Sequence, residues 1–443
     1  MRRHGLHEKR IRRLVVRIRE SLYAIPIAVV LLCGILAIVS LVLDAAVGDK
    51  VVGWPILDTT VAGGRAIAAA VGSATITVAA IVFSITALTT QMASNQYSPR
   101  ALGEFFEDPL QQFIIGLVVG TFTYSLLVLA SLGSAIVDGS AARPSVSATV
   151  GIVLGVGSAL GIVVYINHSL RQMQIDSVVR RIADSAISAL EEQLSREDDS
   201  ILSDGPPPEG EPRGMKATVG GWVVALDVDG ALDALPPRST CRMDVRLGEA
   251  VSVDDTILTV WPDPGEDWDA TSLKRSVVTA KERSLEQDPS FGIRQLVDIA
   301  LRALSTGVND PTTAVDVIHH LKTPVRTVLL SDAPVRVFKG PDERRVFLPN
   351  TPGRSDYVHA AFAEIRLAAR RQPYVLGALM EVLTDLIADL RWLELQDREG
   401  PVRAELIETV KTARNSDFPE LDLKRLMEGR SIENYLDEDV SSE

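Results

Sequence analysis

Residues 66–99 read AIAAAVGSATITVAAIVFSITALTTQMASNQYSP, 34 consecutive positions without a charged side chain. A helix needs roughly 20 predominantly apolar residues to cross about 30 Å of hydrocarbon. Three other uncharged runs are at least that long, and they occupy Ser21–Leu43, Pro109–Val137 and Pro144–Leu170. The sequence therefore predicts an α-helical membrane domain of four transmembrane helices.

The basic residues predict how these helices are oriented. The first run is longer than the 7 to 15 apolar residues of a cleaved signal, so we expect it to remain as an anchor. The only basic residues in the segments expected outside are Lys50, Arg65 and Arg143. Because basic residues favour the cytoplasmic side, both termini are predicted to be cytoplasmic. The basic residues of the first 20 positions are Arg2, Arg3, Lys9, Arg10, Arg12, Arg13, Arg17 and Arg19.

Charge separates the two halves of the chain. Residues 1–166 hold 12 Lys+Arg against 9 Asp+Glu, whereas residues 167–443 hold 33 against 49. Such an acidic region argues against nucleic acid as a partner. Cys33 and Cys241 are too few for a framework of disulfides, as in a reducing compartment. The partners we expect are the lipid bilayer, further copies of the chain and an unidentified cytoplasmic protein, with no cofactor.

The second run carries a continuous stripe of small and hydroxyl-bearing residues. A straight helix over Ala66–Pro99 would be about 50 Å long, longer than the hydrocarbon is thick. No bulky apolar side chain falls in two neighbouring heptad columns of this helix. Such a stripe can serve close helix packing alone, or it can line a narrow polar path. The columns are Ala66, Ser73, Ala80 and Ala87, and Ala70, Thr77, Ser84 and Gln91.

A path along this helix would have identifiable parts. Its polar lining would be Ser73, Thr77, Ser84 and Gln91. Phe83 and Leu88 are candidate gates because their bulk could close a narrow neck. Arg65 near the outer mouth slightly favours anions.

Glycines are regularly spaced in the third and fourth runs, with Gly116 and Gly120 four apart in the third. This spacing predicts that the two helices pack as a tight antiparallel pair. None of the four runs contains Asp, Glu, Lys or Arg, which disfavours transport coupled to protons or cations.

Two stretches of the sequence resemble a bacterial family of predicted membrane proteins, the domain of unknown function 2254. The first is Val82–Thr86 followed by Gln91–Arg100, and the second is Glu286–Leu304 continuing to Asn309–Ala314. The resemblance covers nearly the whole chain. It implies a four-span protein of the bacterial inner membrane with a large cytoplasmic domain, and it brings no catalytic residues. Thr306 stands where the family is expected to have a proline.

The region after the fourth run is predicted to be an α+β domain. Short β-branched segments within 215–265 indicate a small β-barrel or sandwich module. A hairpin is expected between Pro334 and Pro349, turning near Gly340. The predicted order is a basic N-terminus at 1–20, the membrane domain at 21–170, a helix and linker at 171–214, the β module at 215–265, a mainly helical domain at 266–414 and a partly disordered acidic tail at 415–443.

Candidate sites in this domain are few. Asn309, Asp310, Thr312 and Thr313 could receive an anion at a helix N-terminus, although capping by Asp310 explains them equally. Asp316, His319 and His320 lie within helical reach, but adjacent histidines point about 100° apart, so we expect no metal site. The sequence contains no P-loop, nucleophile elbow, zincin spacing or dinucleotide fingerprint, and we expect no enzymatic activity.

These observations leave two hypotheses. The first is a homo-oligomeric, channel-like protein that passes small ions along the second helix, with the cytoplasmic domain as a vestibule or gate. The second is a non-conducting membrane scaffold or sensor whose cytoplasmic domain binds a partner or a small ligand. The second predicts that helices of the same subunit fill the stripe.

Overall fold

A computed structural model describes most of the chain as two compact units, Met1–Gln174 and Ile175–Glu443. The basic N-terminus predicted at 1–20 lies outside the described residues. So does the C-terminal part of the predicted tail. The described residues are 24–47, 58–96, 109–138, 143–172, 175–194, 210–265, 267–285, 287–331 and 337–428.

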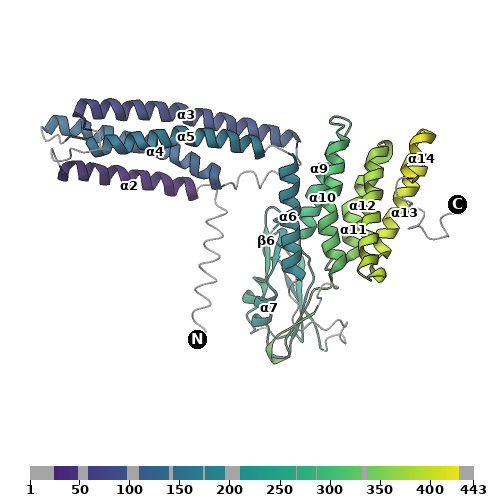
Figure 1. Cartoon of the computed structure of the whole chain (residues 1–443). Helices are drawn as coiled ribbons and strands as arrows, with labels where there is room; N and C mark the ends of the chain where they lie inside the picture. Colours follow the sequence, from purple (N-terminus) through teal and green to yellow (C-terminus); the bar gives the residue numbers. More distant parts are fainter. Residues whose placement is uncertain are drawn as a thin grey trace. The chain divides into compact units, whose positions relative to one another are not determined.

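The first unit contains the four predicted apolar helices (Figure 1). They are α2 (Ala24–Val47), α3 (Val61–Gln96), α4 (Pro109–Asp138) and α5 (Ser145–Gln172). By length and composition, each can cross a membrane. The prediction of four membrane-spanning helices is confirmed at this level.

Helices α4 and α5 each contact the three other spanning helices, and α4 packs most extensively against α2 and α3. A Cβ atom at Gly116 would lie 2.9 Å from the Cα atom of Pro26, and one at Gly120 would lie 2.7 Å from the Sγ atom of Cys33. These glycines therefore let α2, not α5, approach α4 closely.

The assignment of these two glycines to the pairing of α4 with α5 is wrong. On α5, however, Cβ atoms at Gly151 and Gly161 would lie 3.6 Å from Tyr124 and 3.7 Å from Ile114 of α4, so the fourth helix does turn glycines toward the third.

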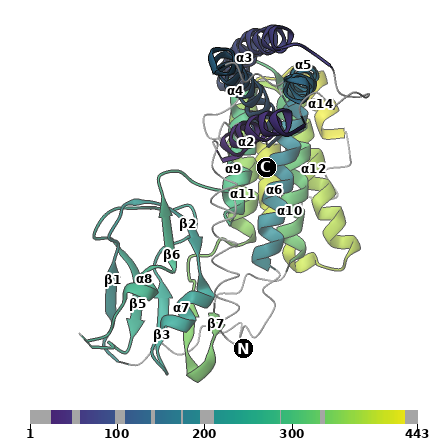
Figure 2. The same cartoon turned by 90° about the vertical axis from the view of Figure 1, so that its left-hand side faces the viewer.

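The second unit is built on a bundle of antiparallel and crossing helices (Figures 1 and 2). Helix α9 packs against α6, α10 and α11, and α12 packs against α10, α13 and α14. The bundle consists of α6 (Ile175–Leu194), α9 (Pro289–Ala303), α10 (Pro311–Leu330), α11 (Arg354–Ala368), α12 (Pro373–Trp392), α13 (Gly400–Arg414) and α14 (Glu420–Glu428). Helix α14 lies within 415–443, the segment that the sequence predicts to be a partly disordered acidic tail.

Two of these helices begin with the same local signal, an aspartate followed by proline. Asp288 caps α9 by accepting a hydrogen bond from the backbone N–H of Phe291. Asp310 caps α10 in the same way through the N–H of Thr313. Proline suits the first helical position because its missing N–H has no partner there in any case.

Beside the helices, the second unit holds two small sheets. One has the order β1-β5-β3-β8-β7 and the other β4-β2-β6. All described pairings are antiparallel except that of β3 with β8. The strands are β1 (Arg213–Lys216), β2 (Gly221–Leu226), β3 (Thr240–Met243), β4 (Ala250–Val251), β5 (Thr256–Trp261), β6 (Val277–Ala280), β7 (Val337–Lys339) and β8 (Arg345–Phe347). Short helices α7 (Val228–Ala234) and α8 (Thr271–Lys274) pack on them.

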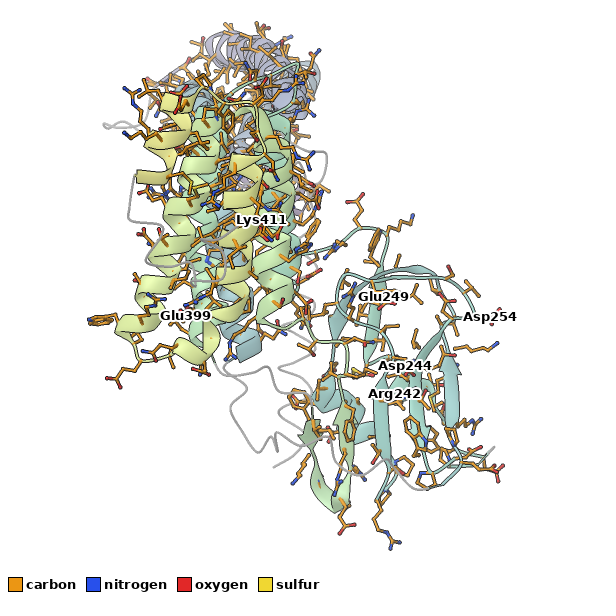
Figure 3. All side chains as sticks on the ribbon, turned by 90° about the vertical axis from the view of Figure 1, so that its right-hand side faces the viewer. Arg242, Asp244, Glu249, Asp254, Glu399 and Lys411 are labelled. Carbon is orange, nitrogen blue, oxygen red and sulfur yellow. The ribbon has the colours of Figure 1, made fainter. Side chains whose placement is uncertain are left out.

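The sheets form one mixed module, and no closed barrel occurs among the described residues. Their shared core includes Val223, Leu258 and Val346. The predicted hairpin is present as β7 and β8. It joins β3 in parallel, so the module also uses residues well beyond the predicted range 215–265. Figure 3 labels Arg242 and Asp244 on this sheet, where their side chains form an ion pair.

Candidate functional site

One face of α3 packs against α4 and α5 and consists mostly of small residues. Ala68, Gly72, Thr75, Ala79 and Val82 are buried on this face. Small side chains permit close contact between helices in lipid, where apolar burial provides little driving force. This face therefore accounts for how α3 joins the bundle.

The four predicted path-lining residues lie together on the opposite face of α3. Ser73, Thr77, Ser84 and Gln91 are all exposed. The hydroxyl of Thr77 donates to the carbonyl oxygen of Ser73 at 3.0 Å, within the same helix. In the described part of the chain, no other helix buries this stripe. The alanines of the stripe are exposed as well, at positions Ala66, Ala70, Ala80 and Ala87.

The predicted gates flank this stripe. Phe83 is 54% exposed and Leu88 is 57% exposed. At 100° per residue they lie on opposite sides of the line through Ser73 and Ser84. Arg65 is exposed in the first turns of α3. The roles of these three residues in gating and ion choice stay predictions.

In contrast, several polar side chains inside the bundle are paired across helices, although among the described residues the buried hydroxyl of Ser125 on α4 is not. The hydroxyl groups of Thr121 on α4 and Ser158 on α5 are 2.9 Å apart. Tyr124 on α4 donates to the carbonyl oxygen of Ser147 at 2.9 Å, and its hydroxyl also lies 2.9 Å from that of Ser40 on α2. Such interhelical hydrogen bonds hold membrane helices together.

Asp44 is a buried carboxylate near the end of α2, with only 6% of its surface exposed. It accepts hydrogen bonds from the backbone N–H groups of Val146 at 2.7 Å and Ser147 at 3.0 Å, and from the hydroxyl of Ser147. A carboxylate at a helix N-terminus also complements the positive end of the helix dipole. Asp44 thus caps α5 from another helix. The uncharged run ends one residue earlier, at Leu43, so reasoning from runs misses this acid.

The predicted anion site at the start of α10 has the geometry of a helix cap. The carboxylate of Asp310 accepts from the N–H of Thr313 at 3.2 Å and from its hydroxyl at 2.6 Å. The side chain of Gln372 donates to the amide oxygen of Asn309 at 3.0 Å. Thr312 is exposed. Binding of an anion by Asn309, Asp310, Thr312 and Thr313 stays a prediction, because capping alone explains these contacts.

Asp316 lies in a group of titratable side chains on α6 and α10. Burial, together with the nearby carboxylate of Asp176, raises the pKa of Asp316, while the imidazoles of His319 and His320 act in the opposite direction. Among the described residues, no cluster of three or more His, Cys, Asp or Glu side chains could hold a metal ion.

The start of the second stretch that resembles the family, near Asp288, lies between the sheets and the helices of the second unit. Arg283 pairs with Asp288, whose side chain is 3% exposed, at 2.5 Å. Its guanidinium also lies over the rings of Trp222 at 5.8 Å and Phe291 at 4.8 Å. The Cβ atom of a larger residue at Gly292 would lie 2.7 Å from that of Ala186 on α6. These contacts give the motif a structural role.

Both cysteines are free and buried. Burial, followed by the charge of Asp244, raises the pKa of Cys241 to about 12. A thiol with so high a pKa is almost entirely protonated at neutral pH and is a poor nucleophile.

Comparison with known proteins agrees with this architecture. A family model described as "Predicted membrane protein (DUF2254)" matches residues 19–385. The chain is 32% identical over 330 residues to the uncharacterized protein Rv1290c of Mycobacterium tuberculosis. It has the same identity to the uncharacterized protein Mb1321c of Mycobacterium bovis. In each comparison the match spans 72% of this chain and 63% of the relative, which is less than two thirds of the relative's length. No solved structure matches the chain. The chain belongs to the DUF2254 family of predicted membrane proteins.

Proposed function

We propose that the protein is a homo-oligomeric, channel-like protein of the bacterial inner membrane that passes small ions along α3. Copies of α3 surround a common axis, and Ser73, Thr77, Ser84 and Gln91 face that axis. Both termini are cytoplasmic, and the C-terminal unit forms a vestibule or gate. The proposal involves no enzymatic step and no cofactor.

The observation that carries the proposal is the outward face of α3. Its hydroxyl and amide side chains are exposed in the single chain, directly opposite the face that packs on α4 and α5. Polar side chains are costly against hydrocarbon and favour contact with other protein or with water. Neighbouring copies of α3 can provide that contact, and a ring of such faces leaves a narrow polar path.

The finer features of the proposal depend on the residues beside the stripe. Phe83 and Leu88 act as barriers when the copies approach one another. Arg65 gives the outer mouth a positive charge, which favours anions slightly by simple attraction.

The test is ion flux through liposomes that contain the purified protein, compared with Ser73→Leu and Ser84→Leu. Each substitution places a bulky apolar side chain on the stripe, so flux should fall at least tenfold while the oligomer persists. Ala159→Leu is the matched control, because Ala159 is exposed on α5 away from the stripe. It should leave flux within about twofold of the parent protein.

A monomer in mild detergent, together with no crosslinks between cysteines placed along α3, would overturn the oligomeric path. No flux under any ion, potential or pH would instead favour the alternative of a non-conducting scaffold or sensor. That alternative expects helices of the same subunit to cover the stripe of α3, whereas Ser73 and Ser84 are exposed.

A further inference from the structure

Three helices of the second unit surround a cavity of about 480 Å³. Helix α12 contacts both α10 and α14 (Figure 1). Val315 and His319 line the cavity from α10, four residues apart, and Tyr374, Gly377 and Glu381 line it from α12 at spacings of three and four. Residues at these spacings share one face of a helix. The cavity volume lies within the roughly 300–1,000 Å³ typical of sites for small molecules.

Helix α14 forms the third wall. Asp422, Arg425 and Leu426 face the cavity, again at spacings of three and four. A Cβ atom at Gly377 would lie 3.3 Å from the Cδ2 atom of Leu426, so the glycine lets α14 approach α12. Asp422 and Arg425 form no ion pair with any residue that the structure describes. Helix α14 therefore presents one carboxylate and one guanidinium to the same space.

The floor of the cavity is mostly apolar. Val315, Ala378 and Met380 are buried, whereas Tyr374, which also lines the cavity, is 64% exposed. The buried hydroxyl of Thr384 is already bonded to the carbonyl oxygens of Met380 at 2.8 Å and Glu381 at 2.9 Å. The hydrogen of this hydroxyl is therefore already used, and only its oxygen can still accept a hydrogen bond.

We propose that this cavity binds an α-amino acid with a large apolar side chain. The ligand's carboxylate pairs with Arg425, and its ammonium group pairs with Asp422, with Glu381 adding negative charge on the facing wall. Its side chain lies on the apolar floor formed by Val315, Ala378 and Met380. A zwitterion fits this arrangement because both signs of charge occur on one face of α14, three residues apart. This binding is independent of ion conduction along α3.

The test is titration calorimetry on the full-length protein in detergent, with l-leucine and l-phenylalanine as probes. Two compounds each lack one charge of leucine: 3-methylbutylamine lacks the carboxylate and 4-methylpentanoate lacks the ammonium group. Leucine should bind saturably, and both single-charge compounds should bind at least tenfold more weakly than leucine or not at all.

Two variants locate the site. Arg425→Met should weaken amino-acid binding at least tenfold, and Ala378→Leu should do the same by filling the floor without touching a charge. Lys424→Met is the matched control, because Lys424 is exposed on α14 and does not line the cavity. It should bind within about twofold of the parent protein.

Three outcomes would overturn the proposal. One is the absence of saturable binding of leucine at millimolar concentrations. Another is equal affinity for leucine and for the two single-charge compounds. The third is unchanged binding in both Arg425→Met and Ala378→Leu. Because the readout is heat of binding, these results do not depend on whether the protein conducts ions.

Discussion

Helices α3 and α4 have similar compositions but opposite surroundings. On α4, Thr121 and Tyr124 are buried and hydrogen-bonded to residues of α2 and α5. On α3, Ser73 and Ser84 face outward from the bundle. Both helices combine small apolar residues with hydroxyl groups, so composition alone does not separate them. What separates them is packing, since α4 lies against α2, α3 and α5, whereas α3 packs mainly against α4 and α5 and leaves one face outward.

This difference shows where a polar path could be built. Hydroxyl groups that are paired within one chain stabilise the bundle and are not available to water or ions. Hydroxyl groups that face outward can bond to their own helix, as Thr77 does, but they find other side chains or water only outside the chain. A path along α3 therefore has to be assembled between copies, whereas the polar interior around α4 holds each copy together.

The largest effect is expected for Asp44, the carboxylate that caps α5. Asp44→Ala leaves two backbone N–H groups and the hydroxyl of Ser147 without this acceptor. The loss should lower the free energy of unfolding of the membrane unit by ~3 kcal/mol. Thermal unfolding of the purified protein in detergent measures it.

The matched control for this carboxylate is Asp58→Ala. Asp58 pairs with Arg143 at 3.2 Å, but both side chains are about half exposed, 52% and 51%. An exposed pair contributes at most ~1 kcal/mol. Equal losses of unfolding free energy in Asp44→Ala and Asp58→Ala would mean that the buried cap contributes no more than the exposed ion pair.

The second unit offers a similar contrast at Glu399, which Figure 3 labels in the helical part of that unit. Its carboxylate is 6% exposed and accepts from Arg391 at 2.9 and 3.2 Å and from Arg403 at 3.1 Å. Glu399→Gln should destabilise the protein by ~2 kcal/mol at neutral pH. Glu408→Gln, which removes an exposed pair with Lys411, should cost less than ~1 kcal/mol.

The pH dependence of the Glu399 variant follows from its surroundings. Burial raises the pKa of Glu399, but the hydrogen bonds and charges of Arg391 and Arg403 outweigh burial and lower it overall. A lowered pKa stabilises the fold above the ordinary glutamate pKa, and the contribution is lost as pH falls through the folded-state value. The difference between the parent protein and Glu399→Gln should therefore shrink in acid. A difference that grows as pH falls would contradict this assignment.

Much of the fold follows from local patterns in the sequence. Uncharged runs locate the four spans, and Asp310 before Pro311 locates the start of α10. Run lengths and caps are local properties, so they can be read without knowing which elements meet.

Contacts between distant segments could not be predicted in the same way. Gly116 and Gly120 have the spacing of a packing face, but the spacing does not say that α2 is the partner. The parallel pairing of β3 with β8 joins segments about 100 residues apart, and the sequence of neither strand indicates the other as its partner. The cavity likewise depends on α14, whose short amphipathic pattern lies in an acidic region that resembles a tail.

A smaller effect on stability is expected when Thr121 inside the bundle is compared with Thr77 on the outward face of α3. Thr121→Val removes the hydrogen bond to Ser158 and should cost ~1 kcal/mol of stability. Thr77→Val removes only a bond to its own helix, to the carbonyl oxygen of Ser73, and should change stability by less than ~0.5 kcal/mol. Unfolding of both variants in detergent measures the difference. A larger loss for Thr77→Val would mean that the outward stripe already has partners in the detergent-solubilised protein.

The smallest effect is expected for Asp316, and it has the opposite sign. Its pKa is raised first by burial and then by the carboxylate of Asp176. A raised pKa favours the folded state only when the acid is protonated, so this contribution is complete below the ordinary aspartate pKa and is lost as pH rises through the folded-state value. At neutral pH the ionised carboxylate is therefore unfavourable, and Asp316→Asn should stabilise the protein by ~0.5 kcal/mol or less.

Thermal unfolding between neutral pH and pH ~4 should show this gain disappearing in acid. Asp417→Asn, at an exposed position before α14, is the control and should give no gain at either pH. A stabilisation by Asp316→Asn that persists unchanged in acid would show that it does not arise from the charge of Asp316.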